Sequence, residues 1–440
     1  MITEFGARSF AAVVALWALV GPAGAQTQTA FSASVESSIQ SIFPRMMEWR
    51  RDFHEHPELS YEEVRTARIV AQHLRALRME VRTNVARTGV VGVLRGGRPG
   101  PVIALRADMD ALPVTEEVDL PFRSTVRATY NGQQVGVMHA CGHDTHVAVL
   151  MAAASVLAAQ RAQLAGTVIF VFQPSEEGRP SDGSAGGAER MLAEGVFGDL
   201  EPEVIFGLHA WPSAAGTVVV TPGPFMAGSD RLRITVTGSQ THGAQPHRGV
   251  DPIVVSSQIV TALQTIPARQ MDAVRSPVIV TIGSIRGGVR YNIIPERVEM
   301  EGTIRYLNPG TREDLYNRIR RTATEIAESA GARAEVSIEP NAIPVVNPPE
   351  PTARALTALV RALGEGAVLT DQPNMVAEDF AYFQQAVPGV FFFYGVRPPG
   401  VELADAAPNH SPRFFVHEPA METALRALLA VSLDRVGGAG

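Results

Sequence analysis

An unbroken apolar run from residue 167 to 172, rich in β-branched and aromatic residues, most constrains the fold of this chain. Such a run is typical of a strand buried on both faces, as in a parallel sheet covered by helices. Similar runs alternate with helical patterns along the chain. The predicted strands lie at 90–94, 102–106, 204–208 and 390–394, and the predicted helices lie at 62–77, 144–164, 188–194, 352–363 and 419–436. This alternation predicts an α/β fold in which helices cover both faces of a mostly parallel sheet.

The pattern between residues 225 and 341 differs and predicts a second domain inserted into the first. Its order is strand 231–238, helix 251–266, strand 277–286, strand 296–307, helix 311–330 and strand 333–339. This βαββαβ order is that of a ferredoxin-like α+β domain, and a Pro/Gly-rich stretch at 221–224 marks its start. We therefore expect a catalytic domain in two parts, 26–224 and 342–440, around a satellite domain at 225–341.

Composition and charge narrow the classes of function. The 440 residues are 45% hydrophobic and 19% charged, which fits two or more globular domains with a large core. The net charge of −7 argues against nucleic acid or an anionic membrane as the main partner. The chain contains no lysine, which excludes Schiff-base and Ser-Lys chemistry, and its single cysteine excludes an intrachain disulfide. We expect a protein that acts on small molecules.

The N-terminus resembles a secretory signal. An apolar run from Ser9 to Val20 is followed by Ala23-Gly24-Ala25, an A-x-A type cleavage site. The run is shorter than the roughly 20 residues that span a bilayer. We expect residues 1–25 to be a signal peptide and the mature protein to be exported, periplasmic or secreted, without a membrane association.

The only cysteine, Cys141, lies between His139 and His143 on a loop that leads into an alanine-rich helical pattern. A thiolate and imidazoles suit zinc or another borderline first-row ion, and a spacing of two does not fit one helix face. A lone buried cysteine beside a histidine is, however, more often packing than a ligand. What strengthens the metal interpretation is that further ligand-type residues follow strand-like runs or lie in loops, at Glu176, Glu177, His209 and His410.

Two acids, Asp108 and Asp110, follow the strand at 102–106. Open α/β sheets place their sites at the carboxyl ends of the strands, although aspartates also build ordinary turns. A ligating histidine needs a partner for its second ring nitrogen. We therefore count Asp110 among the candidate catalytic residues.

Convergence of Cys141, His143, Glu177, His209 and His410 would give more ligands than the four of a closed structural site. Two divalent metal ions per subunit (Zn, or Mn, Co or Ni) that share a bridging ligand and a water are the simplest interpretation. Glu176 would then be free to act as general base, because neighbouring residues on an extended chain point differently. The competing interpretation is a non-catalytic exported protein in which one zinc stabilises the core.

Several of these motifs together resemble the M20 metallopeptidase family, in its amidohydrolase branch. The matching stretches are 52–59, 106–113, 138–146, 172–178, His209, 241–244, 292–295, 378–380 and His410. The resemblance implies the same five metal ligands and the same base. It also implies hydrolysis of N-acyl amino acids such as hippurate or N-acetyl and indole-acetyl conjugates, with dipeptidase or exopeptidase action as the alternative.

The resemblance adds roles that spacing does not reveal. It implies that His242 helps to stabilise the tetrahedral oxyanion, commonly in a neighbouring subunit's active site, and that Asn292 contacts the substrate's carboxylate end. It also implies a homodimer or a higher homo-oligomer. Arg248 is a further candidate for carboxylate binding by its chemistry, although a position at the solvent-exposed rim is the simpler interpretation. The loop at 179–186 is longer than the resemblance leads us to expect, and it could reshape the acyl pocket.

Overall fold

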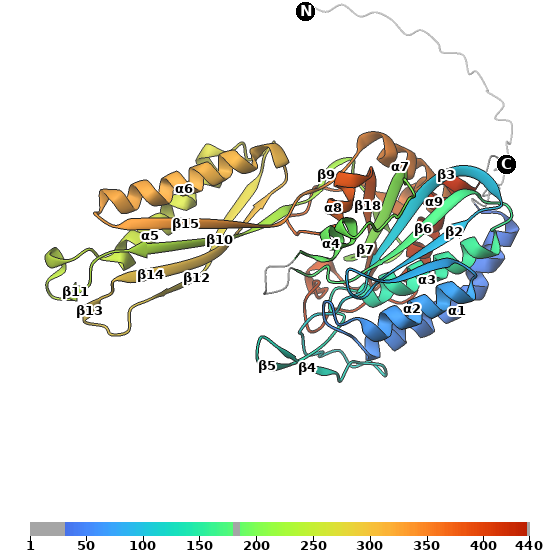
Figure 1. The fold of residues 1–440 in the computed structure, drawn as a ribbon, viewed down its shortest axis with the longest axis horizontal. Coiled ribbons are helices and arrows are strands. Elements are labelled where there is room, and N and C mark those ends of the chain that lie inside the picture. Colours follow the sequence, from blue (N-terminus) through green and yellow to red (C-terminus); the bar gives the residue numbers. More distant parts are fainter. Residues whose placement is uncertain (1–30, 179–184, 438–440) are drawn as a thin grey trace, which may run out of the picture.

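A computed structural model describes residues 31–178 and 185–437, so the expected signal peptide and most of the long loop at 179–186 lie outside the described residues. The described chain forms two lobes that lie side by side (Figure 1). One lobe contains a large twisted sheet with helices on both faces. The other is smaller and built from one contiguous segment of the chain.

The large lobe is formed by the two ends of the described chain. Its helices are α1 (Ala33–Glu55), α2 (Val64–Ala76), α3 (His143–Ala159), α4 (Gly187–Ala193), α7 (Pro349–Leu363), α8 (Phe380–Ala386) and α9 (Ala420–Val436). Its main sheet contains β1 (Glu80–Val85), β2 (Gly89–Arg95), β3 (Arg98–Asp108), β6 (Ala165–Gln173), β7 (Val204–Ala214), β8 (Val218–Val219), β17 (Val368–Leu369) and β18 (Gly389–Arg397).

The strand order in this sheet is β1-β2-β6-β3-β7-β18-β8-β17. The four central strands β6, β3, β7 and β18 run parallel, whereas β1 and β2 at one side pair antiparallel. The parallel centre explains the unbroken apolar runs in the sequence, because these strands are covered by side chains on both faces. The carboxyl ends of the parallel strands therefore meet at one edge of the sheet.

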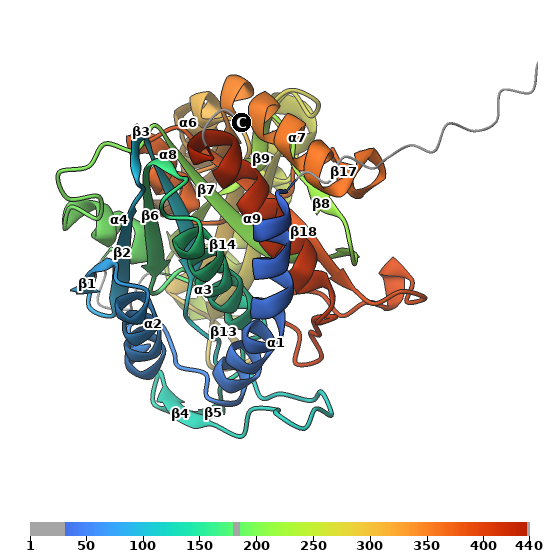
Figure 2. The same cartoon turned by 90° about the vertical axis from the view of Figure 1, so that its right-hand side faces the viewer.

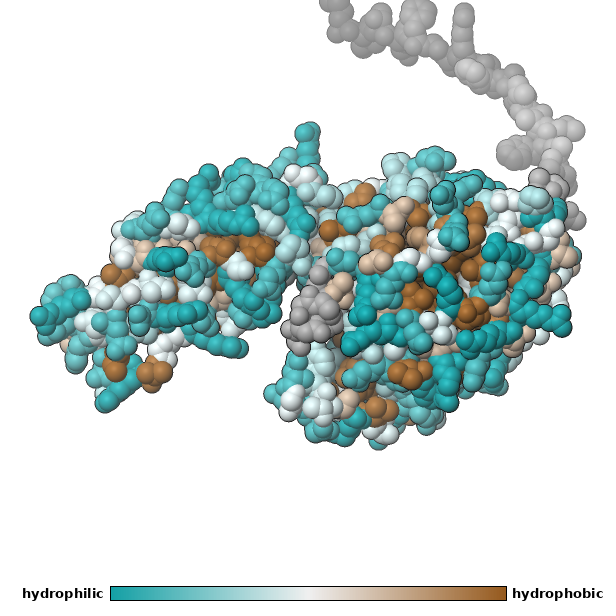
Figure 3. Space-filling view, in the orientation of Figure 1, coloured by the Kyte–Doolittle hydropathy of each residue, from teal (hydrophilic) through white to brown (hydrophobic). Residues whose placement is uncertain are grey.

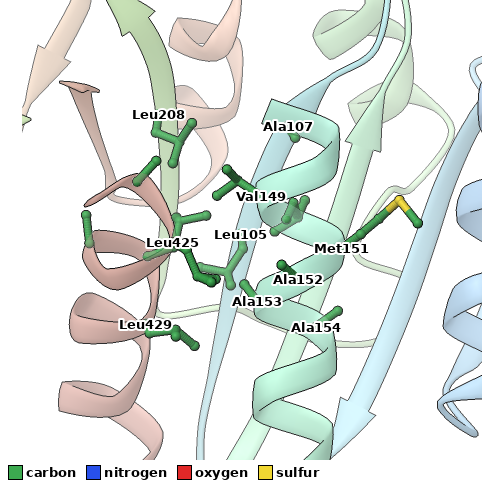
Figure 4. Close-up of a cluster of buried hydrophobic side chains, with 14 of the residues drawn as sticks. Leu105, Ala107, Val149, Met151, Ala152, Ala153, Ala154, Leu208, Leu425 and Leu429 are labelled. Carbon is green, nitrogen blue, oxygen red and sulfur yellow. The ribbon is translucent and has the colours of Figure 1, made fainter. Parts of the chain in front are cut away.

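Helix α3 lies between two layers of the large lobe because its sequence is apolar on all sides. Its residues from His143 to Ala154 are all buried, so this part of the helix has no solvent face. Helices of this kind lie inside a protein, and α3 packs between the sheet and α1 (Figure 2). Small side chains at Ala152, Ala153 and Ala154 allow the close approach, while Leu425 and Leu429 of α9 pack beside them (Figure 4). A second apolar cluster, which includes Phe380 and Phe383 of α8, covers the opposite face of the sheet.

The smaller lobe has its own four-stranded antiparallel sheet. Its elements in chain order are β10 (Gly228–Thr237), α5 (Pro252–Leu263), β12 (Val278–Gly287), β14 (Arg297–Tyr306), α6 (Arg312–Ser329) and β15 (Arg333–Ala342). The sheet order is β12-β14-β10-β15, and both helices pack on one face of it. This is the βαββαβ arrangement of the ferredoxin-like fold, as the sequence predicts.

Short elements complete the structure. Strands β9 (Gly223–Met226) and β16 (Val345–Asn347) pair where the chain passes between the lobes, and β4 (Arg127–Tyr130) and β5 (Gln133–Gly136) form a hairpin below the large lobe. Strands β11 (Thr241–His242) and β13 (Ile293–Ile294) pair at the far tip of the smaller lobe.

The expected fold class is confirmed: an α/β sheet that is parallel at its centre, with helices on both faces and a ferredoxin-like insertion. Within the described chain, no helix has the length and apolar character needed to cross a membrane.

Candidate metal centre and catalytic site

A cleft of about 440 Å³ lies at the carboxyl edge of the parallel strands, within the range of small-molecule sites. The large lobe contributes Cys141, Glu176, Glu177, His209 and His410 to its lining. The smaller lobe contributes the ends of three strands, through Ser229, Arg305, Asn341 and Ala342. The site is therefore shared by the two lobes.

The structure brings the five sequence-predicted ligands together. Ligand atoms of Cys141, His143 and Glu177 lie within 4.8 Å of one another. The Sγ atom of Cys141 lies 3.3 Å from Nε2 of His209, and Nε2 of His410 lies 3.2 Å from Oε1 of Glu177. Four of these side chains are largely or fully buried, whereas His410 is 55% exposed and forms the outer side of the cluster.

The loop that carries Cys141 and His143 has a glycine between them for a steric reason. Gly142 has a φ of +91°, and a Cβ there would lie 2.8 Å from Cβ of Ala210, next to His209 on β7. Only glycine allows this backbone to turn and approach so closely. The backbone N–H of His410 donates to the carbonyl oxygen of Ala140 over 2.8 Å, which ties the C-terminal loop to the cysteine loop.

His143 is oriented for an ion. Its Nδ1 lies 2.8 Å from the backbone oxygen of Asp110, so Nδ1–H donates, and the neutral ring would offer the lone pair of Nε2 to an ion. Although fully buried, Nε2 has no hydrogen-bond partner among the described residues. It lies 3.8 Å from both Oδ2 of Asp108 and Oε1 of Glu177. A buried, unpartnered nitrogen facing carboxylates is what a cation between them would satisfy, so the residues fit a metal.

The charges of the buried side chains in the cluster also favour bound cations. Burial, with the charges of Glu177 and Glu176, raises the pKa of the Cys141 thiol well above its usual range. Burial and the neighbouring His146 hold the pKa of His209 well below its usual range, so His209 is a neutral imidazole. A thiolate among carboxylates therefore needs a bound cation, which a neutral imidazole can help to hold.

Asp108, His143, His146 and His209 form a second group with metal-ligand chemistry. His146 is not free to bind an ion, because its Nδ1 lies 2.5 Å from Oδ1 of Asp108 and its Nε2 accepts the N–H of Ala210 over 2.8 Å. It supports the centre by holding Asp108 and the β7 backbone beside His209.

Glu176 faces a different group from its neighbour Glu177. Ligand atoms of Glu176, Glu378 and Asp379 lie within 4.8 Å of one another, and Oε1 of Glu176 accepts the N–H of Asp379 over 3.4 Å. Burial, followed by the charges of Glu378, Glu177 and Asp379, raises the pKa of Glu176 well above its usual range. A carboxyl group with a raised pKa suits proton transfer near neutral pH.

Arg106 organises the carboxylates behind Glu176. This fully buried side chain donates to Gln173 over 2.7 Å, Asp108 over 2.7 Å, Glu378 over 2.8 Å and Asp379 over 3.0 Å. It thus links Asp108, which lies beside His143, to the two carboxylates next to Glu176.

Asp110 supports the turn that carries Glu176 and Glu177. It is buried outside the lining of the cleft, and its carboxylate accepts the backbone N–H groups of Glu176 over 3.0 Å and Glu177 over 3.1 Å and the hydroxyl of Ser60 over 2.7 Å. The sequence leads us to expect that the carboxylate of Asp110 binds the second ring nitrogen of a histidine. In the structure, Nδ1 of His143 lies 2.8 Å from the backbone oxygen of Asp110 and 3.4 Å from its carboxylate oxygen Oδ1. We describe Asp110 as a positioning residue.

Three predicted site residues do not reach the cleft of their own chain. His242 lies on β11, Asn292 precedes β13 and Arg248 follows β11, all at the tip of the smaller lobe that is farthest from the large one (Figure 1). His242 and Arg248 are exposed. None of the three contributes to the lining of the described cleft.

Arg305 lines the cleft and was not identified from the sequence. It lies at the end of β14, on the sheet face opposite the helices, and it forms no ion pair or hydrogen bond with the described residues through its side chain. The nearby Asp230 is already bonded to Tyr316 and Arg312. Alternation along β14 places Arg305 on the polar face, but the sequence does not show which end of the strand meets the other lobe.

A Cys/His/Glu cluster at the carboxyl edge of an α/β sheet, with a free carboxylate beside it and an inserted ferredoxin-like lobe across the cleft, defines a metal-dependent hydrolase. Comparison with known proteins gives the family. The model of peptidase family M20/M25/M40 matches residues 104–434, so the chain belongs to the M20 family. The resemblance seen in the sequence is confirmed, and the chain is a hydrolase that acts on amides.

Relatives of this chain match it over nearly its whole length. Thermostable carboxypeptidase 1 of Saccharolobus solfataricus is 40% identical and covers 91% of this chain and 98% of its own. N-acetylcysteine deacetylase of Bacillus subtilis is 37% identical and covers 88% and 95%. A crystal structure of a dinuclear metal-binding M20 peptidase, also from Bacillus subtilis, matches with a TM-score of 0.73 at 35% identity and covers 90% and 98%.

Proposed function

We propose that this chain hydrolyses the amide bond of N-acyl amino acids to a carboxylic acid and a free amino acid. The observation that carries the proposal is the joint placement of the five ligand residues, the free carboxylate of Glu176 and the cation of Arg305 around one cleft. The similarity to an N-acetylcysteine deacetylase supports it.

We propose that Cys141, His143, Glu177, His209 and His410 hold two divalent metal ions. The similarity to a dinuclear M20 peptidase and the excess of ligands over four support two ions. The thiolate and imidazole donors favour zinc, with Mn, Co or Ni as alternatives. When bound, such a pair lowers the pKa of a bound water and polarises the substrate carbonyl.

Glu176 is the proposed general base. Its carboxylate takes the proton of the attacking water and later donates it to the leaving nitrogen, because an amide anion leaves poorly without a proton. Burial, with the charges of Glu378, Glu177 and Asp379, raises the pKa of Glu176, which suits a group that both accepts and returns a proton.

Arg305 is the proposed partner of the substrate's carboxylate. Arg305 is half-buried in the cleft wall of the smaller lobe, where a charge-assisted bond to a carboxylate is strong. An apolar wall, formed by Trp211, Met226, Met375 and Val376, lies in the same cleft and suits the acyl group or the amino-acid side chain.

A second candidate function is removal of a C-terminal residue from a dipeptide or peptide. The similarity to a thermostable carboxypeptidase favours it. The two functions differ in the free amine of a dipeptide, so turnover of hippurate should be compared with that of glycyl dipeptides. Preference for the dipeptides would refute N-acyl amino acids as the main substrates.

The base assignment is tested with Glu176→Gln. We expect kcat to fall by about 10²- to 10⁴-fold, the range of general acid–base catalysis, with the metal content unchanged. Glu177→Gln is the matched control, and it should lose metal as well as activity. Normal turnover in Glu176→Gln would refute the assignment.

We further propose a homodimer in which the tip of one smaller lobe serves the partner's cleft. Strand β12 has one free edge, and exposed apolar side chains lie near it, at Val289, Tyr291, Ile285, Ile253 and Val254. Apolar atoms appear at this tip in Figure 3. Such a patch is typical of an interaction surface. A dimer would give His242, Asn292 and Arg248 a role in trans, and sedimentation of a pure monomer would refute it.

Two proposals concern the ends and divisions of the chain. We propose that residues 1–25 are removed on export, so that N-terminal sequencing of the periplasmic or secreted protein should begin at Gln26.

We also propose domain boundaries at 224/225 and 341/342. The segment 225–341 expressed alone should unfold cooperatively, and a non-cooperative transition would refute these boundaries.

A further inference from the structure

The turn that carries Glu176 and Glu177 is held by its backbone N–H groups. Three successive groups, from Ser175 to Glu177, each donate to a buried carboxylate. Asp110 accepts those of Glu176 and Glu177, and Oε1 of Glu63 accepts that of Ser175 over 2.9 Å. Ser175 has a φ of +50°, a conformation that a residue with a Cβ adopts only when its surroundings hold it there.

Glu63 is well placed to hold this turn. It is fully buried, and Oε1 also accepts the N–H of Tyr61 over 2.9 Å while Oε2 accepts the hydroxyl of Thr88 over 2.5 Å. No cation among the described residues pairs with it. Burial without a counter-ion is costly, and burial together with the charge of Asp110 raises the pKa of Glu63 to about 8.

The ordinary structural explanation would be that Glu63 caps α2, since it directly precedes that helix. The structure argues against this explanation. The side chain of Glu63 makes no capping bond. Glu58 does so instead, because its two carboxylate oxygens accept the N–H groups of Arg65 and Thr66 over 2.8 Å each. The side chain of Glu63 is therefore available to cross to the turn after β6.

We propose that Glu63 is a positioning residue that holds the Ser175–Glu177 turn and thereby aims the base Glu176 at the substrate. The inference rests on the proposed role of Glu176. Ser175 is the residue directly before the base, so a change in its backbone angles redirects the side chain that follows. Asp110 alone would leave the first N–H group of the turn unpaired and buried.

Four variants of the full chain test this inference, Glu63→Ala, Glu63→Asp, Glu63→Gln and Glu58→Ala as the matched control. Glu63→Ala should lower kcat by about tenfold or more, the value of one well-placed hydrogen bond, with KM and metal content changed by less than about twofold. Glu63→Gln should restore kcat, because its oxygen accepts both N–H groups and its amide donates to Thr88. Glu58→Ala should lower the Tm and leave kcat unchanged.

Hydrogen exchange gives a readout that does not depend on turnover. The amides of residues 175–177 should exchange about tenfold faster in Glu63→Ala and at the normal rate in Glu58→Ala. Glu63→Asp, whose shorter side chain cannot reach Ser175, should behave like Glu63→Ala and replaces it if the alanine variant fails to fold.

Unchanged exchange at 175–177 would overturn the inference even if the wild-type protein hydrolyses no N-acyl amino acid. Normal kcat in Glu63→Ala, an equal loss in Glu58→Ala, or a loss of metal in place of rate would also overturn it. If Glu176→Gln is inactive while Glu63→Ala is fully active, the proposed function stands and only the role of Glu63 fails.

Discussion

Replacing Arg106 by methionine would test how far the stability of the large lobe depends on the charge network behind the site. The guanidinium is fully buried and donates to Gln173 and to three carboxylates, those of Asp108, Glu378 and Asp379. Methionine has a similar length and no charge, so the variant leaves three buried acids without their cation.

The size of the effect follows from this geometry. Removing one partner of a buried ion pair costs about 3–5 kcal/mol, because the remaining charge is left uncompensated. Three acids lose their cation here, which puts the expected loss at the upper end, about 5 kcal/mol. Proton uptake limits the loss, since burial already raises the pKa of Asp379 to about 8 and that of Glu378 above its usual value. A domain has about 5–15 kcal/mol in all, so the variant should be barely stable.

The assay is urea unfolding of chelated protein, which removes any contribution of bound metal. An acid whose folded pKa is raised destabilises the folded state at high pH and ceases to do so once the pH falls below its unfolded pKa. Without Arg106 the pKa values of Glu378 and Asp379 rise further. The stability gap between wild type and variant should therefore be larger at pH 8 than at pH 5.

A loss below about 2 kcal/mol, or a gap that does not shrink on acidification, would contradict this account of Arg106. Arg413→Met is the matched control. Arg413 pairs with Glu117 over 2.9 Å at the surface, where 75% of its side chain is exposed. Its loss should change stability little at either pH.

Three further predictions concern the cleft. Arg305→Met should raise KM for N-acyl amino acids by about 10- to 100-fold, the value of a charge-assisted bond, and leave kcat nearly unchanged, whereas an unaltered KM would refute its carboxylate role. Chelation should abolish hydrolysis and lower the Tm, and Zn or Mn should restore both; a chelated protein that keeps its activity would refute the metal centre. Mixing and refolding inactive Glu176→Gln and His242→Ala chains should restore about a quarter of the wild-type activity if His242 acts in trans, and no recovery would refute that arrangement.

Most of the fold could be predicted from the sequence because its long elements have clear periods. The unbroken run at 167–172 and the alternation along β14 reflect burial on two faces and on one face respectively. Short strands such as β8 and β17, and the seven-residue helix α8, were not predicted, since they depend on neighbours distant in the sequence. The local sequence pattern does not show which distant segments will contact these elements.

In the candidate site, too, some residues could be predicted from the sequence and others could not. The convergence of Glu177 and His209 follows from their positions near the carboxyl ends of the parallel strands β6 and β7, which meet at one edge, whereas Cys141 lies on the loop that leads into α3. Arg305 and Glu63 could not be identified, because an arginine on a polar strand face and a glutamate before a helix have ordinary local explanations. Their roles depend on which surfaces the folded chain brings together.

The place of β18 in the central sheet has a consequence for the order in which the chain folds. Strand β7 pairs with β18 through partners such as Ile205 and Gly389, and the entire ferredoxin-like segment lies between them in the sequence. That segment has its own core and can fold before the central sheet is complete. The edge of β7, by contrast, stays unpaired until residues 389–397 reach it, and an open apolar strand edge invites aggregation. Slow closure of this long-range pair should therefore lower the yield of folded protein.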